Sequence, residues 1–337
     1  MKAMILAAGL GTRMRPLTLL RAKAVLPVLN RPLLLWILEH LARQGVDDVV
    51  VNLHHLPDTV GEALGEWRRS GMRLRYSRED KLLGTAGGPR AVRDVFGDEP
   101  FLLVNGDMLF DFDVARLVQR HRASGARATL ALLPNPDPKL YGSIVTDASG
   151  RVLSLAGQPR RARGTASLFT GVHVLDPALL DTLPAGPSDT IRDLYVPMVA
   201  AGERVQGVRL RGAWHDLGRP SLYRDAQLKL LPGRGRDRVL LHPDAQVGAG
   251  ARLRRSVVGR GARVGEDAQV ERSILWDSAT VEAGSRVDGA IVASGGVVRS
   301  GEKARGVVVV PRRALKTTED VGGRAEDRDG MAWVELK

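Results

Sequence analysis

The residues best suited to chemistry near the start of the chain form a glycine-containing turn that is followed by cations. The sequence there reads Leu6-Ala7-Ala8-Gly9-Leu10-Gly11-Thr12-Arg13, and Lys23 follows ten residues after Arg13. Gly9 and Gly11 leave backbone N–H groups clear of side chains, and guanidinium and ammonium groups bind phosphate oxygens. We therefore expect this turn to hold a polyphosphate. It lacks the third glycine of a dinucleotide turn and the Gly-Lys-Ser/Thr of a P-loop.

Two acidic side chains follow apolar segments later in the chain. Asp107 ends the run Phe101-Leu102-Leu103-Val104-Asn105-Gly106-Asp107, and Asp216 lies in Trp214-His215-Asp216-Leu217-Gly218. Taken alone, each carboxylate fits a helix cap or a turn as well as a metal site. Because the chain has no cysteine, a metal ion would need oxygen or imidazole ligands, and Mg²⁺ is the ion that we expect.

The elements that must position these side chains follow from the alternation of short apolar runs with amphipathic segments up to about residue 218. This alternation predicts an α/β fold with a Rossmann-like, mostly parallel sheet. We expect strands over residues 2–7, 48–53 and 101–105, and helices over residues 33–44 and 219–231. Ligands bind at the carboxyl ends of parallel strands, so segments 8–15, 52–55 and 106–107 are expected to converge on one crevice.

A repeat of 17 residues begins after a Pro/Gly-rich break at residues 232–236. Three series of apolar residues share this period: Val247, Val264, Val281 and Val298; Leu253, Val270 and Val287; Val258, Leu275 and Val292. Small residues and glycines lie between them, as tight corners require. The spacing predicts a three-sided coil, and the pattern resembles the hexapeptide repeats of left-handed β-helices, which we expect over residues 239–311. The charged tail, 312–337, is expected either to be disordered or to pack on the surface of the helix.

The turn resembles the signature Gly-x-Gly-Thr-Arg-x-Arg-Pro-x-Thr of the sugar-1-phosphate nucleotidyltransferases, a family with guanylyl-, thymidylyl- and uridylyltransferase members. The likeness covers Met1 to about Leu231, and the β-helix is similar to the accessory domain of several members. The resemblance implies a catalytic domain at 1–231, a linker at 232–238, and an enzyme that uses Mg²⁺. Its substrates would be a nucleoside triphosphate, with GTP favoured, and a sugar 1-phosphate of the mannose 1-phosphate type.

The resemblance also implies roles for individual residues. Arg13, Lys23 and Asp107 are expected to be catalytic, with Mg²⁺ held by Asp107 and Asp216. The nucleotide would be bound by Leu6, Ala8, Gly9, Gly11, Thr12, Arg13, Glu79, Gly84 and Thr85, and the sugar by Gly142, Thr170 and Gly171. A Glu79 carboxylate can accept two hydrogen bonds from guanine but one from uracil or thymine, so guanine is preferred and the two pyrimidines remain alternatives.

One segment departs from the family pattern. Many members carry Glu-Lys-Pro, with the glutamate for sugar hydroxyls and the lysine for the sugar phosphate, where this chain has Gly157-Gln158-Pro159, followed by Arg160, Arg161 and Arg163. This departure leaves open an unusual sugar, or a regulatory homologue that binds nucleotide sugars without making them. Acyl transfer in the β-helix is not expected, because the last histidine, His242, precedes the regular repeat.

Composition limits the partners of the chain. The net charge is +12, but the arginines are scattered from Arg13 to Arg328 and are not gathered with aromatic residues, so no nucleic-acid partner is expected. No apolar stretch approaches the roughly 18 residues that a membrane span needs. The first strand begins at once and leaves no room for a leader, so we expect a cytoplasmic protein. We expect the β-helix to support a homo-oligomer.

Overall fold

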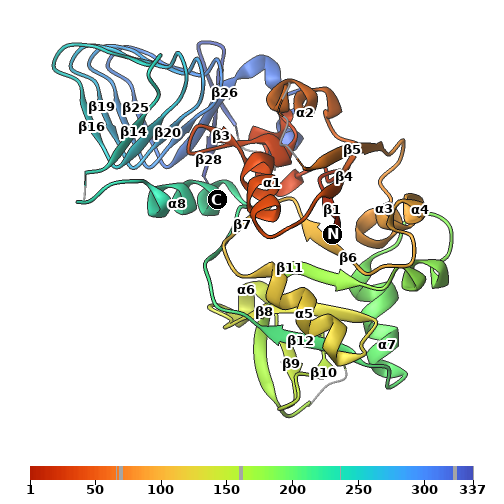
Figure 1. Ribbon diagram of the computed structural model, residues 1–337. Helices are drawn as coiled ribbons and strands as arrows, with labels where there is room; N and C mark the ends of the chain where they lie inside the picture. The colour runs from red at the N-terminus through yellow and green to blue at the C-terminus, as the bar shows by residue number, and fades with distance from the viewer. Residues whose placement is uncertain (66, 68–70, 159–161, 236, 322–324, 337) are drawn as a thin grey trace. The chain divides into compact units, whose positions relative to one another are not determined.

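Figure 1 shows the computed structural model, which describes residues 1–65, 67, 71–158, 162–235, 237–321 and 325–336. Contacts between Cα atoms divide the chain into two compact units, which are described separately. The first unit consists of Met1–Gly9, Ile37–Pro57 and Gly65–Trp214, and the second of Leu10–Trp36, Asp58–Leu64 and His215–Lys337. Within the described residues, no helix has both the length and the apolar character needed to cross a membrane.

In the described part of the first unit, nine strands form one mixed sheet with the order β10-β9-β11-β6-β1-β4-β5, and β8 and β12 continue it from β11. The strands are β1 (Lys2–Leu6), β4 (Asp48–Leu53), β5 (Arg73–Arg78), β6 (Phe101–Asn105), β8 (Ala128–Leu133), β9 (Ile144–Thr146), β10 (Val152–Ser154), β11 (Thr165–Leu175) and β12 (Val205–Arg209). β6, β1, β4 and β5 run parallel, as does the pair β8 and β12, whereas β11 is antiparallel to its neighbours. The apolar runs of β1, β4 and β6 are buried almost throughout, as in strands that are covered on both faces.

Helices pack around the sheet and complete this unit. The helices of this unit are the last part of α1 (Leu33–Arg43), α3 (Gly84–Ala91), α4 (Arg93–Phe96), α5 (Val114–Ser124), α6 (Pro138–Tyr141), η4 (Pro177–Thr182), the π-helix η5 (Thr190–Tyr195) and α7 (Val196–Ala200). α5 begins where Asp113 accepts a hydrogen bond from Arg116 N and ends at Gly125, which has φ +63°. In the core, Phe96 and Phe101 stack with ring centroids 3.8 Å apart.

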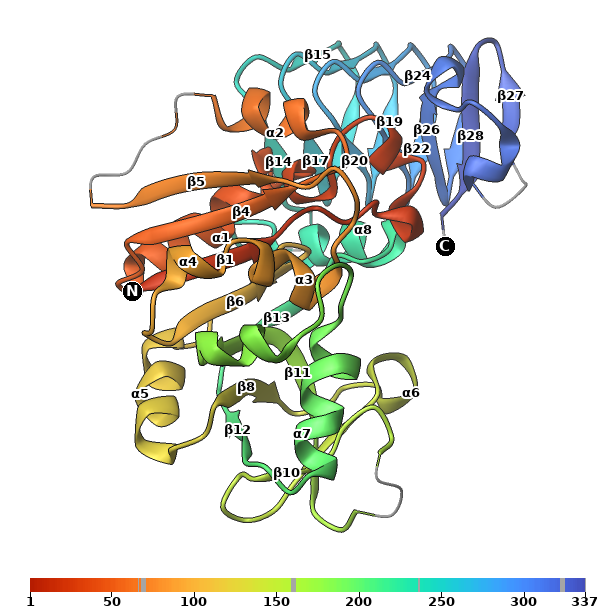
Figure 2. The ribbon, with the colours of Figure 1, turned by 90° about the vertical axis from the view of Figure 1, so that its right-hand side faces the viewer.

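The 17-residue repeat predicted for the second unit is confirmed as a three-sided β-helix, whose stacked coils are visible in Figures 1 and 2. Val247, Val264, Val281 and Val298 pair along one face, and the other two apolar series pair in the same way. The faces consist of β14 (Val239–Leu241), β17 (Ser256–Val258), β20 (Ile274–Leu275), β23 (Ile291–Val292) and β26 (Val307–Pro311); β15 (Gln246–Val247), β18 (Arg263–Val264), β21 (Thr280–Val281) and β24 (Val297–Val298); β16 (Arg252–Arg254), β19 (Gln269–Glu271), β22 (Arg286–Asp288) and β25 (Lys303–Arg305).

Burial along the β-helix is uneven. Val281 and Val298 are fully buried, whereas Val247 in the first coil is 42% exposed. The corners leave little space: a methyl group on Gly259 would come 2.6 Å from the backbone of Trp276 in the next coil. Only glycine fits where two coils approach so closely.

The described part of the charged tail is ordered on the last coil. It contains η6 (Arg312–Ala314), η7 (Thr318–Val321), β27 (Glu326–Arg328) and β28 (Met331–Glu335). β28 pairs antiparallel with β26, and β27 pairs with β28 (Figure 2). Of the two expectations for this tail, packing on the β-helix therefore matches the described residues.

The segment that follows β1 belongs to the second unit. It contains η1 (Thr12–Met14), η2 (Leu17–Leu19), η3 (Lys23–Val25), β2 (Pro27–Val28) and β3 (Arg31–Pro32), and it meets α2 (Pro57–Leu64) and α8 (Pro220–Leu230). Leu29 N donates to Gln227 Oε1 of α8 at 2.9 Å, and Asn30 Nδ2 donates to Val258 O of the β-helix at 2.9 Å. Side chains of α8 and of the coils thus fix the path of this segment.

Candidate active site

In the first unit, the carboxyl end of β1 is tied to both of its neighbours. Gly106 N donates to Leu6 O at 2.9 Å, and Ala7 N donates to Asn52 Oδ1 at 2.7 Å. A methyl group on Gly106 would come 2.6 Å from Leu6 O, so this close approach requires glycine. It places Asp107, which is partly buried, directly after the contact with the end of β1. Ala8 is buried and Gly9 is exposed.

Glu79 lies in a hydrogen-bond network behind this edge. Its side chain is buried, with 7% exposure, and Oε1 accepts from Asn52 Nδ2 at 2.7 Å. Oε2 accepts from Leu83 N at 3.0 Å. A methyl group on Gly88 would come 2.8 Å from Oε1, so α3 also packs closely on the carboxylate. Sequence reasoning missed this use of Glu79 and the part played by Asn52, whose only signal was a polar residue near the end of a buried strand.

Gly84 and Thr85, at the start of α3, rest on the segment that leads into η5. Gly84 has φ +77°, and a methyl group there would come 2.4 Å from Ser188 O. Thr85 Oγ1 donates to Asp189 Oδ2 at 2.8 Å and accepts from Thr190 N at 2.9 Å. The Thr85 hydroxyl therefore fixes the start of α3, and no sequence pattern indicates its partners.

Of the three predicted sugar-binding residues, Thr170 contacts Trp214 directly. Thr170 is buried, its Oγ1 donates to Ala131 O at 3.0 Å, and its carbonyl accepts from Trp214 Nε1 at 3.0 Å. Gly171 has φ +81° and packs on Asn105, within an irregularity of β11. Tyr141 meets Trp214 edge-on with ring centroids 5.2 Å apart. Gly142 ends α6 with φ +66° and has open space around its Cα.

The segment that departs from the family pattern forms a tight turn. Leu155 and Gln158 exchange backbone hydrogen bonds of 3.0 and 2.9 Å, and Gly157 has φ +72°. Pro159, Arg160 and Arg161 lie outside the described residues.

In the second unit, Gly11 begins the loop that carries the predicted phosphate-binding cation. It has φ +61°, and its carbonyl accepts from Met14 N at 2.8 Å and from Thr18 Oγ1 at 2.8 Å. This turn starts η1 and leaves Thr12 and Arg13 exposed. The second predicted phosphate-binding cation, Lys23, begins η3, where Ala22 N donates to Thr59 Oγ1 of α2 at 3.0 Å.

Arg13 and Asp216 meet at Gly218. Gly218 N donates to Asp216 Oδ1 at 2.7 Å. A methyl group on Gly218 would come 2.7 Å from Asp216 Oδ1 and 3.5 Å from Arg13 Nη2. Asp216 and Gly218 are therefore neighbours of Arg13 of the signature loop within this unit, although they lie far from it in sequence.

The donor chemistry fits magnesium. Asp107 and Asp216 are partly buried carboxylates, and the described residues contain no group of three or more histidine, aspartate or glutamate side chains arranged for a metal. Mg²⁺ is commonly bound through one or two carboxylates and takes its remaining oxygens from water and substrate phosphates. Each of these carboxylates is thus a suitable oxygen donor for this ion.

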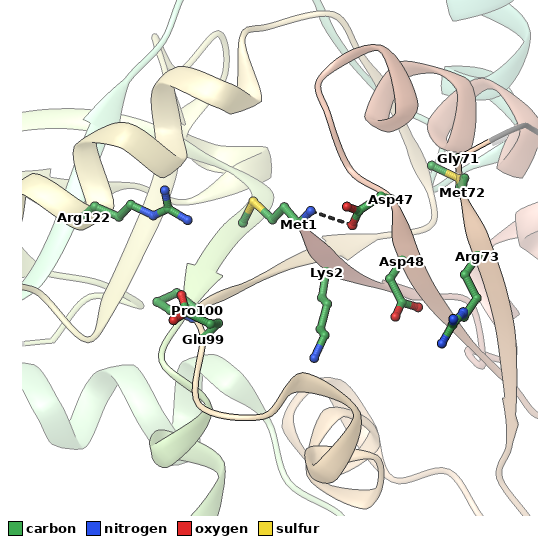
Figure 3. Close-up of a pocket in the computed structure, with 10 residues that line it drawn as sticks. All are labelled: Met1, Lys2, Asp47, Asp48, Gly71, Met72, Arg73, Glu99, Pro100 and Arg122. Carbon is green, nitrogen blue, oxygen red and sulfur yellow. Dashed lines mark hydrogen bonds and ion pairs between the residues drawn. The ribbon is translucent and has the colours of Figure 1, made fainter.

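A hollow in the first unit lies at the amino ends of the parallel strands, opposite the edge where the predicted site residues follow β1 and β6 (Figure 3). Its volume is about 690 Å³, and it is lined by Arg122 of α5 and by residues at or before the starts of β1, β4, β5 and β6, including Lys2, Asp48 and Arg73. The amino group of Met1 donates to Asp47 Oδ1 at 2.6 Å. Ligands of parallel sheets bind at the carboxyl ends of the strands, and none of the predicted site residues lines this hollow.

A buried histidine of β11 is hydrogen-bonded to a residue outside the predicted site. His173 is 1% exposed, and its Nδ1 is hydrogen-bonded to the hydroxyl of Tyr195 in η5. Burial lowers the pKa of His173 to about 3, so the ring is neutral near neutral pH. We assign it to the packing of η5 on the sheet.

Comparisons with known proteins identify relatives of both parts of the chain. A family model described as Nucleotidyl transferase matches residues 2–232, and one described as GlmU-like, C-terminal hexapeptide matches residues 239–311. A UTP–glucose-1-phosphate uridylyltransferase of Synechocystis sp. is 33% identical over 65% of this chain and 60% of its own length. The mannose-1-phosphate guanylyltransferase catalytic subunit beta of Dictyostelium discoideum is 32% identical over 65% and 62%.

Two further matches extend the comparison. A probable mannose-1-phosphate guanylyltransferase 1 of Oryza sativa subsp. japonica is 31% identical over 74% of both chains. A crystal structure of HddC from Yersinia pseudotuberculosis complexed with GMP-PN has a TM-score of 0.59 at 20% identity, covering 68% of this chain and 99% of that one, which shows a shared fold. The chain spans only about 60% of the length of the first two relatives. From the family model over residues 2–232 and the 31% identity over 74% of the chain, we conclude that the chain belongs to the nucleotidyl transferase family.

Proposed function

We propose that the protein transfers a nucleoside monophosphate from a nucleoside triphosphate to a sugar 1-phosphate, giving a nucleoside diphosphate sugar and pyrophosphate. The observation that carries the proposal is the meeting of Arg13 and Asp216 at Gly218, which joins the two family motifs in one unit. The names of the curated relatives, all sugar-1-phosphate nucleotidyltransferases, support the reaction type.

In this reaction an oxygen of the sugar phosphate attacks the α-phosphorus of the triphosphate. The bond from the α-phosphorus to the bridging oxygen breaks, and pyrophosphate leaves with the electron pair. The attacking group is already an anion, so no protein nucleophile or general base is needed. Arg13 and Lys23 stabilise the charge that develops on the leaving group and hold it in line.

Asp107 and Asp216 are the residues that would hold Mg²⁺. The ion, when bound, supplies positive charge to the phosphates of both substrates. The two aspartates contribute hard oxygen donors from separate segments of the chain. The backbone from Gly9 to Thr12 contributes N–H groups to the triphosphate.

For the base we propose guanine, with uracil or thymine as the alternative. Two relatives are named as mannose-1-phosphate guanylyltransferases, which supports GTP and a mannose 1-phosphate-like sugar. The Synechocystis relative is named as a uridylyltransferase, which supports the alternative. We further propose that residues 1–231 act as the catalytic domain and that the protein self-associates through its β-helix, which light scattering of the full chain tests.

A second candidate, a regulatory homologue that binds nucleotide sugars without making them, is favoured by the Gly157-Gln158 segment, where many members carry Glu-Lys. Pyrophosphate release measured over a panel of four triphosphates and several sugar 1-phosphates with Mg²⁺ separates the two. The transferase predicts turnover with one pair. Binding of a nucleotide sugar with no turnover for any pair would establish the regulatory role instead.

The roles of the site residues are tested with the pair that turns over. Each interaction with developing charge contributes roughly 3 to 4 kcal/mol, so Arg13→Ala and Asp107→Asn should each lower kcat at least about a hundredfold. Arg43→Ala, which removes an exposed arginine from α1, serves as the charge control. Near-normal kcat in either site variant would refute the assigned role.

A further inference from the structure

The two predicted phosphate-binding cations each have an arginine two residues away. Arg15 follows Arg13, and Arg21 precedes Lys23. The intervening chain consists of short 3₁₀ turns, η1, η2 and η3, and contains no long helix or strand. Turns of this length have little stability of their own. The position of Arg13 and Lys23 must therefore depend on what the neighbouring side chains contact.

Arg15 is held by the charged tail. Its Nη1 donates to Asp320 Oδ1 of η7 at 3.3 Å, and the two side chains are 28% and 19% exposed. Asp320 Oδ2 accepts from Lys316 N at 2.9 Å and from Thr317 N at 3.1 Å. The backbone donors, and Arg15 to a smaller extent, lower the pKa of Asp320 and keep it ionised. The carboxylate is thus fixed by its own turn before it meets Arg15.

Arg21 is held by two successive coils of the β-helix. Its Nη2 donates to Asp277 Oδ2 at 2.5 Å and to Ser294 Oγ at 2.8 Å. Asp277 and Ser294 are 17 residues apart, so they occupy the same position in neighbouring coils. The guanidinium also lies over the buried ring of Trp276, 5.5 Å from its centroid, and Tyr223 of α8 bonds to Trp276 Nε1.

From these contacts we infer that Asp277 and Asp320 are positioning residues for nucleotide binding, through which the β-helix and the tail hold Arg13 and Lys23. The inference rests on the proposed function for its effect on turnover. The four side chains of these two ion pairs are 19% to 37% exposed. Ion pairs that solvent reaches add little to overall stability, so the expected signature is a change in the loop and in kinetics without a matching loss of fold. A displacement of about 1 Å in a positioning group can lower turnover on the order of a hundredfold.

The test compares Asp277→Asn, Asp320→Asn and the double variant with two matched controls. Asp288→Asn breaks the ion pair of Asp288 with Arg272 (2.6 Å) on the same β-helix, and Asp327→Asn breaks the pair of Asp327 with Arg312 (3.4 Å) on the same tail. Within the described part of the chain, neither control pair is hydrogen-bonded or ion-paired to residues 10–36. Asn keeps the size of the side chain and an acceptor oxygen.

Two readouts are expected to move together. In the free protein, backbone amides of residues 12–26 should exchange with solvent at least about fivefold faster in the double variant than in the controls. With the substrate pair that turns over, kcat/KM should fall at least about tenfold while the thermal midpoint stays within that of the controls. Asp277→Glu and Asp320→Glu, which keep the charge, should restore much of the loss.

Equal exchange and equal kcat/KM in the double variant and the controls would overturn the inference. So would a drop in thermal midpoint that accounts for the whole kinetic change, since that outcome assigns the aspartates a purely structural role. If the unmodified protein turns over no substrate pair, the proposed function fails, and amide exchange in the free protein still decides whether the two aspartates hold the loop.

Discussion

The network around Glu79 gives the sharpest quantitative prediction. In Glu79→Gln, one carboxylate oxygen is replaced by an NH₂ group, which must face either Asn52 Nδ2 or Leu83 N, both of which are donors. One charge-assisted hydrogen bond is then lost in a site that is only 7% exposed. Such bonds contribute about 1.5 to 3 kcal/mol, so we expect the free energy of unfolding to fall by about 2 kcal/mol.

Urea denaturation gives this free energy, and exchange of the Leu83 amide reports the loss locally. Asp80→Asn, which neutralises the adjacent exposed carboxylate, is the matched control and should change the unfolding free energy by less than about 0.5 kcal/mol. A loss below about 0.5 kcal/mol in Glu79→Gln would refute the reasoning.

The same variant separates support of the fold from recognition of the base. If Glu79 acts through the network, activity with every triphosphate falls by a similar factor, because the ends of β1 and β4 and the start of α3 move together. If its carboxylate contacts the base edge, the ratio of kcat/KM between GTP and UTP changes by orders of magnitude. The prediction that Glu79 binds nucleotide can therefore be decided by one variant and two substrates.

Three further predictions concern the fold around the site. His173 has a pKa of about 3 when folded and about 6.5 when exposed, so between these values the unfolded state binds the extra proton and stability falls as pH drops, by about 1.4 kcal/mol per pH unit. His173→Gln should flatten this slope in urea denaturation between pH 6 and pH 4, and an unchanged slope would contradict the burial argument. Val281→Ala removes two fully buried CH₂-sized groups and should lower the free energy of unfolding by at least about 1.6 kcal/mol. Val247→Ala, at a position that is 42% exposed, should lower it by less than about 0.5 kcal/mol. Equal losses in the two variants would argue against a buried core in the coils. Gly106→Ala forces a methyl group to 2.6 Å from the backbone at the end of β1 and should reduce kcat at least about tenfold through displacement of Asp107, and full activity would show that this close approach is not needed.

Much of the fold could be predicted because it depends on local pattern. The strands at 48–53 and 101–105 have the predicted bounds, and the first strand and the helix at 33–43 differ by one residue. The period of 17 fixed the pairing of three separate apolar series. Buried parallel strands appear as short runs of apolar residues, and stacked coils appear as apolar residues at a fixed period. Both patterns can be recognised in a single sequence.

The contacts that complete the site could not be predicted in the same way. Arg21 contacts Asp277, 256 residues away, and Arg15 contacts Asp320. Both contacts depend on tertiary structure, and no periodic pattern in the sequence indicates them. The sequence predicts a contact between Glu79 and the base, and nothing in it indicates that Asn52 and Leu83 both donate to the Glu79 carboxylate. The tail has no periodic apolar pattern of its own, because its structure depends on the pairing of β28 with β26.

The antiparallel strand β28 has a consequence for how the β-helix ends. Within a stack of parallel coils, each coil pairs its backbone edge with the next coil. At the last coil the same edge has no following coil, and an unpaired edge can pair with another chain. β28 occupies that edge on one face with a strand of opposite direction, so an incoming parallel coil finds its hydrogen-bonding groups already used. β28 thus ends the stack on that face. Coils could be inserted or removed before it in steps of 17 residues without leaving an unpaired backbone edge there.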